Sequence, residues 1–295
     1  MNLLLLPVSI MIGVLGGSAN NYFSKQYMRG ARQGFSFSAC AAVVSACLLL
    51  ALTRSFALPS RYTLALGALY GTVTALGQLM NLLALSKGPF SLTVMLGTGS
   101  MPVTTLICAL FWREAVSLPQ WLGVAMMAAA LVLCAGGARG RPGEKSANLP
   151  WLLLCAGNVL CTVSVGILQK VHQFSPYKGE LDAFLVVSFF VGAGAMTLLS
   201  LTAKRGETGG QPPRLGILAA AALVSGLSAG AINKINMYLV GVMPSVVFFP
   251  VNNGGTVLLS AAVSVTVFRE KLAKRQVAAF ALGLAAIALI GKMLG

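Results

Sequence analysis

One lysine lies among amide side chains in a segment that is otherwise apolar enough to be buried in lipid. Residues 225–244 read SGLSAGAINKINMYLVGVMP, which places Lys234 between Asn233 and Asn236, with Tyr238 one helical turn further on. A charge near the centre of a bilayer costs about 2.5–3.5 kcal/mol on insertion scales, so such residues usually face a cavity or a partner. We expect Lys234 to bind the negative group of a ligand. The alternative is a structural lysine that extends its carbon chain toward the membrane surface.

Further amide side chains interrupt other apolar stretches of the chain. With Lys234 and Tyr238, the predicted substrate-binding residues are Asn20, Asn21, Gln78, Asn81, Asn158, Asn233, Asn236, Asn252 and Asn253. In pairs such as Gln78 and Asn81, a spacing of three residues puts both side chains on one face of a helix. The alternative for each residue is a hydrogen bond between helices, a common use of Asn and Gln in membrane bundles.

Acidic side chains are scarce and avoid the apolar stretches. The six carboxylates are Glu114, Glu144, Glu180, Asp182, Glu207 and Glu270, and all fall in loops or at the ends of predicted helices. The single histidine, His172, is expected at an interface, and this inventory offers neither a catalytic set nor a metal site. We therefore expect a protein that is not an enzyme and needs no cofactor. Amides and one buried lysine without a buried acid predict a small polar substrate with a carboxylate, and a neutral polar solute is the alternative.

The elements that hold these residues are predicted membrane helices. The chain is 57% hydrophobic and 9% charged, whereas soluble domains are about 25% charged. Apolar runs of about 20 residues are long enough to span a bilayer. Ten such runs are predicted, at 3–24, 34–53, 63–85, 89–112, 118–137, 150–170, 181–203, 215–241, 244–268 and 273–293. The net charge of +15 resides mostly in short loops between them, so the expected partners are the lipid bilayer and a small molecule, not nucleic acid.

The two halves of the chain resemble each other. Arg113, Glu114 and Gln120 match Arg269, Glu270 and Gln276 without a gap. We therefore expect one five-helix repeat at 1–138, a linker at 139–149 and a second repeat at 150–295. Because five is odd, the second repeat would cross the membrane in the opposite sense, and inverted repeats are typical of transporters that work by alternating access.

Longer stretches carry a resemblance to a known family. ALSKGPFSLTVMLGTGSMPVTTLICALFWREAVSLPQWLGV and its echo YLVGVMPSVVFFPVNNGGTVLLSAAVSVTVFREKLAKRQVAA are similar to the EamA-like branch of the drug/metabolite transporter superfamily. The resemblance covers essentially the whole chain. It implies an all-α protein of ten helices around a central cavity that moves metabolites, amino acids or drugs across a membrane, for which a bacterial inner membrane is expected.

The side of the membrane on which the termini lie is predicted differently by two arguments. Odd-numbered loops hold 14 of the 21 Lys and Arg residues, and the positive-inside rule then puts both termini outside the cytoplasm. The family resemblance implies that both termini lie inside. Either topology is compatible with a monomer or a homodimer.

Overall fold

The structure, a computed structural model, describes residues 2–27, 30–53, 58–87, 96–97, 99–135, 148–203, 215–266 and 274–291. Within these ranges every regular element is a helix. Among the described residues, five helical stretches are long and apolar enough to cross a membrane: Ala31–Leu52, Arg61–Asn81, Leu149–Gln173, Lys178–Thr202 and Gly216–Val242. The protein is therefore all-α and of membrane type, as predicted.

The described helices follow the predicted apolar runs closely. They are α1 (Asn2–Tyr27), α2 (Ala31–Leu52), α3 (Arg61–Lys87), α5 (Ser100–Phe111), α6 (Leu118–Ala135), α7 (Leu149–Gln173), η1 (Lys178–Glu180), α8 (Leu181–Thr202), α9 (Leu215–Val242), α10 (Ser245–Phe249), η2 (Pro250–Gly254), α11 (Gly255–Thr266) and α12 (Lys274–Gly291). Most of the linker predicted at 139–149, and the start of the run at 89–112, lie outside the described residues. The run at 244–268 is not one regular helix, because η2 is a π-helical turn between α10 and α11.

Side chains placed just before helices explain where several of them begin. Ser117 precedes α6, and both its backbone N–H and its hydroxyl donate to Gln120 Oε1, at 2.9 and 3.1 Å. Asn148 precedes α7 and accepts a 3.0 Å bond from the backbone N–H of Trp151. Such caps satisfy backbone N–H groups that have no partner within the helix.

The helix α5 ends in a turn that fixes the position of Glu114. The backbone N–H of Arg113 donates to Leu110 O (3.3 Å) and that of Glu114 donates to Ala109 O (2.9 Å). This is the Schellman pattern, in which the residue after the C-cap takes a left-handed conformation. Arg113 occupies that position with φ of 49°, although glycine is the usual residue there.

The chain forms two compact units, each built from both ends of the sequence. Unit 1 comprises Met1–Ala75 and Val171–Gly241, and unit 2 comprises Leu76–Lys170 and Val242–Gly295. The chain passes from one unit to the other within α3, within α7 and at the end of α9. Each unit takes residues from both predicted repeats, and the repeats themselves stay a prediction.

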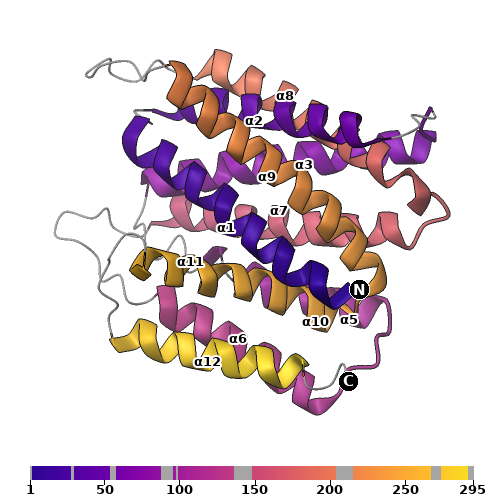
Figure 1. The fold of residues 1–295 in the computed structure, drawn as a ribbon, viewed down its shortest axis with the longest axis vertical. Coiled ribbons are helices and arrows are strands. Elements are labelled where there is room, and N and C mark those ends of the chain that lie inside the picture. The colour runs from indigo at the N-terminus through magenta and orange to yellow at the C-terminus, as the bar shows by residue number, and fades with distance from the viewer. Residues whose placement is uncertain are drawn as a thin grey trace. The chain divides into compact units, whose positions relative to one another are not determined.

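Small residues let the helices of unit 1 approach closely. The helices α2 and α8 run side by side (Figure 1), and the hydroxyls of Ser36 and Ser200 lie 2.6 Å apart between them. A Cβ atom added to Gly67 of α3 would lie 3.0 Å from the carbonyl oxygen of Phe184 in α8. A Cβ atom added to Gly71 would overlap the carbonyl oxygen of Ser188 in the same helix. The backbones of α3 and α8 are therefore in direct contact, as is common in membrane bundles.

In unit 2, α6 and α12 form the corresponding close pair (Figure 1). A Cβ atom on Gly123 would lie 2.5 Å from Ile290 of α12. In η2, Gly254 lies against the side chain of Met127, with no room for a Cβ atom. The π-helical turn is thus held against α6 by packing.

Candidate functional site

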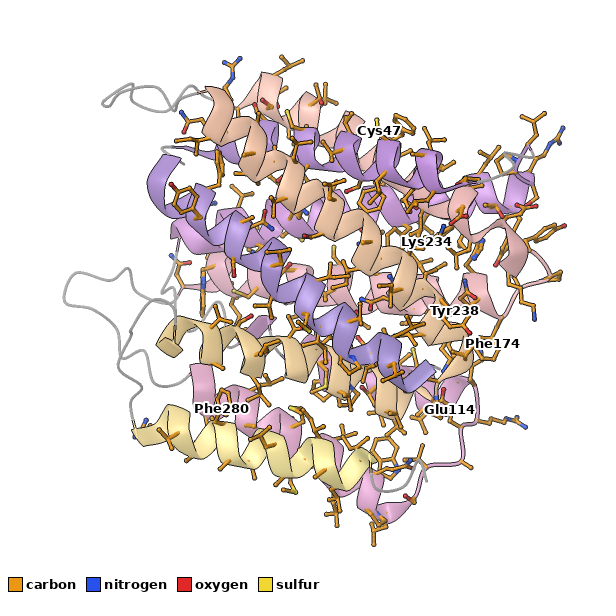
Figure 2. All side chains as sticks on the ribbon, in the orientation of Figure 1. Cys47, Glu114, Phe174, Lys234, Tyr238 and Phe280 are labelled. Carbon is orange, nitrogen blue, oxygen red and sulfur yellow. The ribbon has the colours of Figure 1, made fainter. Side chains whose placement is uncertain are left out.

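A pocket in unit 1 contains the lysine singled out in the sequence. Lys234 Nζ lies 2.8 Å from Asp182 Oδ1, and the two side chains are 33% and 30% exposed. The pocket has a volume of about 410 Å³, and the residues that line it are Leu5, Gly179, Leu181, Asp182, Lys234, Ile235 and Tyr238. Figure 2 labels Lys234 and Tyr238 near the C-terminal end of α9. The site is therefore a partly exposed ion pair in an otherwise neutral, mainly apolar pocket.

The direction of the helices explains how these two charges meet. Asp182 is the second residue of α8, and Lys234 lies eight residues before the end of α9 at Val242, which is about 12 Å along the helix axis. The helices α8 and α9 follow each other in the chain and run in opposite directions, so the end of α9 lies on the same side as the start of α8. The lysine side chain extends toward the start of α8, as lysines in apolar helices commonly extend toward the end of a helix.

The start of α8 is anchored to the start of α3. Glu180 Oε2 accepts hydrogen bonds from the backbone N–H of Ser60 (2.9 Å) and from its hydroxyl (2.8 Å). The Ser60 hydroxyl also lies within hydrogen-bond distance of Thr63, at 3.1 Å. Asp182 lies two positions after Glu180, so the carboxylate that faces Lys234 projects from a fixed helix start.

Three of the predicted amides join helices of unit 1 to one another. Asn20 Oδ1 accepts a 2.7 Å bond from Ser225, and Asn236 Oδ1 accepts a 2.5 Å bond from Ser9; both bonds link α1 to α9. Asn233 Oδ1 accepts a 3.1 Å bond from the hydroxyl of Tyr70 in α3. The alternative considered for such residues, hydrogen bonding between helices, therefore has a geometric basis here. A substrate role for these three amides stays a prediction.

The remaining predicted residues do not all lie in one unit. Gln78, Asn81, Asn158, Asn252 and Asn253 belong to unit 2, and Lys234 and Tyr238 are the predicted residues that line the pocket of unit 1. Asn252 is buried in the π-helical turn, Asn81 and Asn158 are half-buried, and Gln78 and Asn253 are exposed. The side chain of Asn21 lies outside the described part of the structure.

Unit 2 contains a second lysine and carboxylate pair with a different environment. Lys170 is fully buried and pairs with Glu114 Oε1 and with the hydroxyl of Ser245. Glu114 also accepts bonds from the backbone N–H (2.8 Å) and hydroxyl (2.9 Å) of Ser245, and the ammonium lies 5.1 Å from the centroid of the Trp112 ring. Glu114 therefore caps the start of α10.

His172, which the sequence predicts at an interface, lies next to the last residue of α7. Its side chain is fully buried, and its ring packs on Phe184 with centroids 4.5 Å apart. Among the described residues, neither ring nitrogen has a hydrogen-bond partner. Within the same ranges, no three His, Cys, Asp or Glu side chains come close enough together to hold a metal ion.

Asp182 is the charged pocket residue that sequence reasoning did not select. It was counted with the carboxylates at helix ends, where exposure to water makes an acid unremarkable. Two consecutive membrane helices run in opposite directions, so the start of α8 and the end of α9 must lie on the same side. The opposite directions of these helices, together with the isolated charge of Lys234, could have suggested the pair.

A similar fold has been solved. A structure described as "Crystal structure of protein" matches with a TM-score of 0.75 and 16% sequence identity, over 98% of this chain and 96% of the other. No protein-family model matches the chain, and no curated protein matches it. At this identity the comparison shows the fold alone, so function has to be argued from the site.

Proposed function

We propose that the protein is a secondary transporter that moves a small polar metabolite bearing a carboxylate across a membrane without ATP. The observation that carries the proposal is the position of Lys234. Its side chain lines a pocket of about 410 Å³, and the residue belongs to a helix that is long and apolar enough to span a membrane. Charged residues in membrane helices usually mark the pathways of substrates or ions. Amino acids and organic acids belong to the proposed substrate class.

The mechanism proposed is alternating access by two inverted five-helix repeats. Its support is the sequence match between the halves, including Arg113-Glu114 with Arg269-Glu270. Ten helices crossing the membrane, membership of the EamA-like branch of the drug/metabolite transporter superfamily and a bacterial inner membrane location belong to the same proposal. We propose no catalytic activity and no cofactor, and a monomer or homodimer as the working assembly.

The test is flux into liposomes that contain the purified protein. The panel comprises amino acids, monocarboxylates, dicarboxylates, neutral sugars and lipophilic cations. We expect at least one carboxylate-bearing solute to enter faster than in protein-free liposomes, and Lys234→Met to abolish that flux. Lys178→Met is the matched control, because Lys178 is exposed in η1 and does not line the pocket.

Other outcomes of this assay identify the alternatives. Flux of neutral solutes or drugs that persists in Lys234→Met would mean that the amides, not the lysine, recognise the substrate. Movement of labelled lipid between leaflets would indicate a lipid-headgroup flippase. The absence of any flux would leave a membrane subunit that does not itself transport.

A further inference from the structure

The pocket around Lys234 carries one positive and one negative formal charge. Lys234 and Asp182 supply these charges, and the other lining residues are Leu5, Gly179, Leu181, Ile235 and Tyr238. A volume of about 410 Å³ lies within the range of about 300–1,000 Å³ typical of small-molecule sites. Selection by charge must therefore come from the pair, and selection by shape from the apolar residues.

The balance of the two charges disfavours ligands with only one. A simple anion that binds Lys234 would lie next to the carboxylate of Asp182, and like charges repel strongly where water is scarce. A simple cation on Asp182 meets the same repulsion from Lys234.

A ligand with both charges avoids these costs. Asp182 Oδ1 lies 2.8 Å from Lys234 Nζ and is itself buried. The Asp182 side chain as a whole is 30% exposed and lines the pocket, so a ligand ammonium can approach its exposed part. The lysine ammonium has three N–H donors and can bond a ligand carboxylate while it keeps its contact with Asp182. The four charges would then alternate in sign around a ring.

We propose that this pocket binds a small zwitterion, with its ammonium on Asp182 and its carboxylate on Lys234. The short separation of the pair favours charges on neighbouring atoms of the ligand, as in an α-amino acid. The side chains of Leu5, Leu181 and Ile235 favour an apolar ligand side chain. The inference rests on the proposed function and narrows its substrate class from carboxylate-bearing metabolites to apolar zwitterions.

The first test compares three ligands that share one carbon skeleton. Leucine carries both charges, isocaproate lacks the ammonium and isoamylamine lacks the carboxylate. Binding to the purified protein in detergent is measured by calorimetry and by the shift in melting temperature, with methionine and phenylalanine as further zwitterions. We expect at least one of the three zwitterions to bind, and the two single-charge analogues of leucine to bind at least tenfold more weakly than the best zwitterion. The inference would be overturned if isocaproate bound as tightly as that zwitterion. It would also be overturned if no zwitterion bound at millimolar concentration.

Substitutions then assign each charge to its residue. Asp182→Asn should weaken binding of the zwitterion at least tenfold and reduce the ratio between its affinity and that of isocaproate. Lys234→Met should weaken binding of the zwitterion by a similar factor and reduce the ratio between its affinity and that of isoamylamine. Lys178→Met, in the exposed η1 segment, should leave all three affinities unchanged. Equal affinities in Asp182→Asn and the unmodified protein would exclude Asp182 as the ammonium site, and the wild-type series decides the matter if a variant does not fold.

Binding and flux together separate this inference from the proposed function. Zwitterion binding without flux in liposomes would retain the pocket assignment and reject transport. Flux of an organic acid without zwitterion binding would retain transport and reject the zwitterion. Flux and binding of the same amino acid, both lost in Lys234→Met, would support the two proposals together.

Discussion

Two lysine and carboxylate pairs in the described part of the chain use the same chemistry in opposite environments. Lys170 in unit 2 is fully buried, and Glu114 receives bonds from the lysine and from both the backbone and the hydroxyl of Ser245. Lys234 in unit 1 is one third exposed and contacts Asp182 at the edge of a pocket. In the first pair, protein groups bond to both oxygens of the carboxylate. In the second pair, the partner of the Asp182 carboxylate among the described residues is Lys234.

This difference separates a structural pair from one that can exchange partners. Removing one member of a buried pair leaves an uncompensated charge in a medium that cannot solvate it. A partly exposed pair contributes little to stability, because water screens the attraction and competes for both groups. The residue type alone therefore does not tell a functional lysine from a structural one, whereas the number of protein partners around it does.

The largest expected effect is the loss of the buried pair. Lys170→Met leaves the Glu114 carboxylate without its cation, and we expect a loss of about 3–5 kcal/mol in the free energy of unfolding. The measurement is unfolding in detergent followed by circular dichroism. The double variant Lys170→Met with Glu114→Gln should recover much of the loss, because no unpaired charge remains. A Lys170→Met protein as stable as the unmodified one would contradict the structural role.

The helix contact that supports the pocket gives a smaller effect. Gly71 lies against the backbone of Ser188 in α8, the helix that carries Asp182, and has no room for a side chain. Gly71→Val should cost about 1–3 kcal/mol by overpacking and should also weaken ligand binding at the pocket. The control is Gly17→Ala in α1, since an added Cβ atom there meets nothing within 4 Å. Equal melting temperatures for the two variants would show that α3 and α8 do not need this close approach.

The helices could be predicted from the sequence, whereas the pairing of the charges could not. Runs of apolar residues long enough to span a bilayer predicted where α2, α3, α7, α8 and α9 lie, because backbone groups in lipid must be satisfied within a helix. The π-helical turn at Pro250–Gly254 interrupts the single run predicted at 244–268. Asp182 and Glu114 find their partners 52 and 56 positions away. Such contacts depend on which helices become neighbours, and one sequence does not encode that locally.

The third prediction concerns the stability of the exposed pair. Lys234→Met should change the free energy of unfolding by less than about 1 kcal/mol, as is usual for ion pairs in contact with water. The measurement is the free energy of unfolding in detergent, determined for Lys234→Met and Lys170→Met under the same conditions. If Lys234→Met lost as much stability as Lys170→Met, Lys234 would be a structural lysine and the pocket would lose its assignment as a ligand site.

The smallest expected effect tests how Glu114 is held in place. Arg113 has φ of 49° in the turn that ends α5, and a side chain in the left-handed region costs about 1–2 kcal/mol that glycine avoids. Glycine also loses more backbone entropy on folding, by about 0.5–1 kcal/mol, so Arg113→Gly should raise stability by only about 0.5 kcal/mol. Arg113→Val, which keeps a Cβ branch in the same conformation, should instead lower stability and loosen the bond between Glu114 and Ser245. The two variants are compared by melting temperature, with Lys178→Met as a control for the loss of one exposed positive charge. If Arg113→Gly were destabilising and Arg113→Val neutral, the turn would not be what places Glu114, and the buried pair would depend on Lys170 and Ser245 alone.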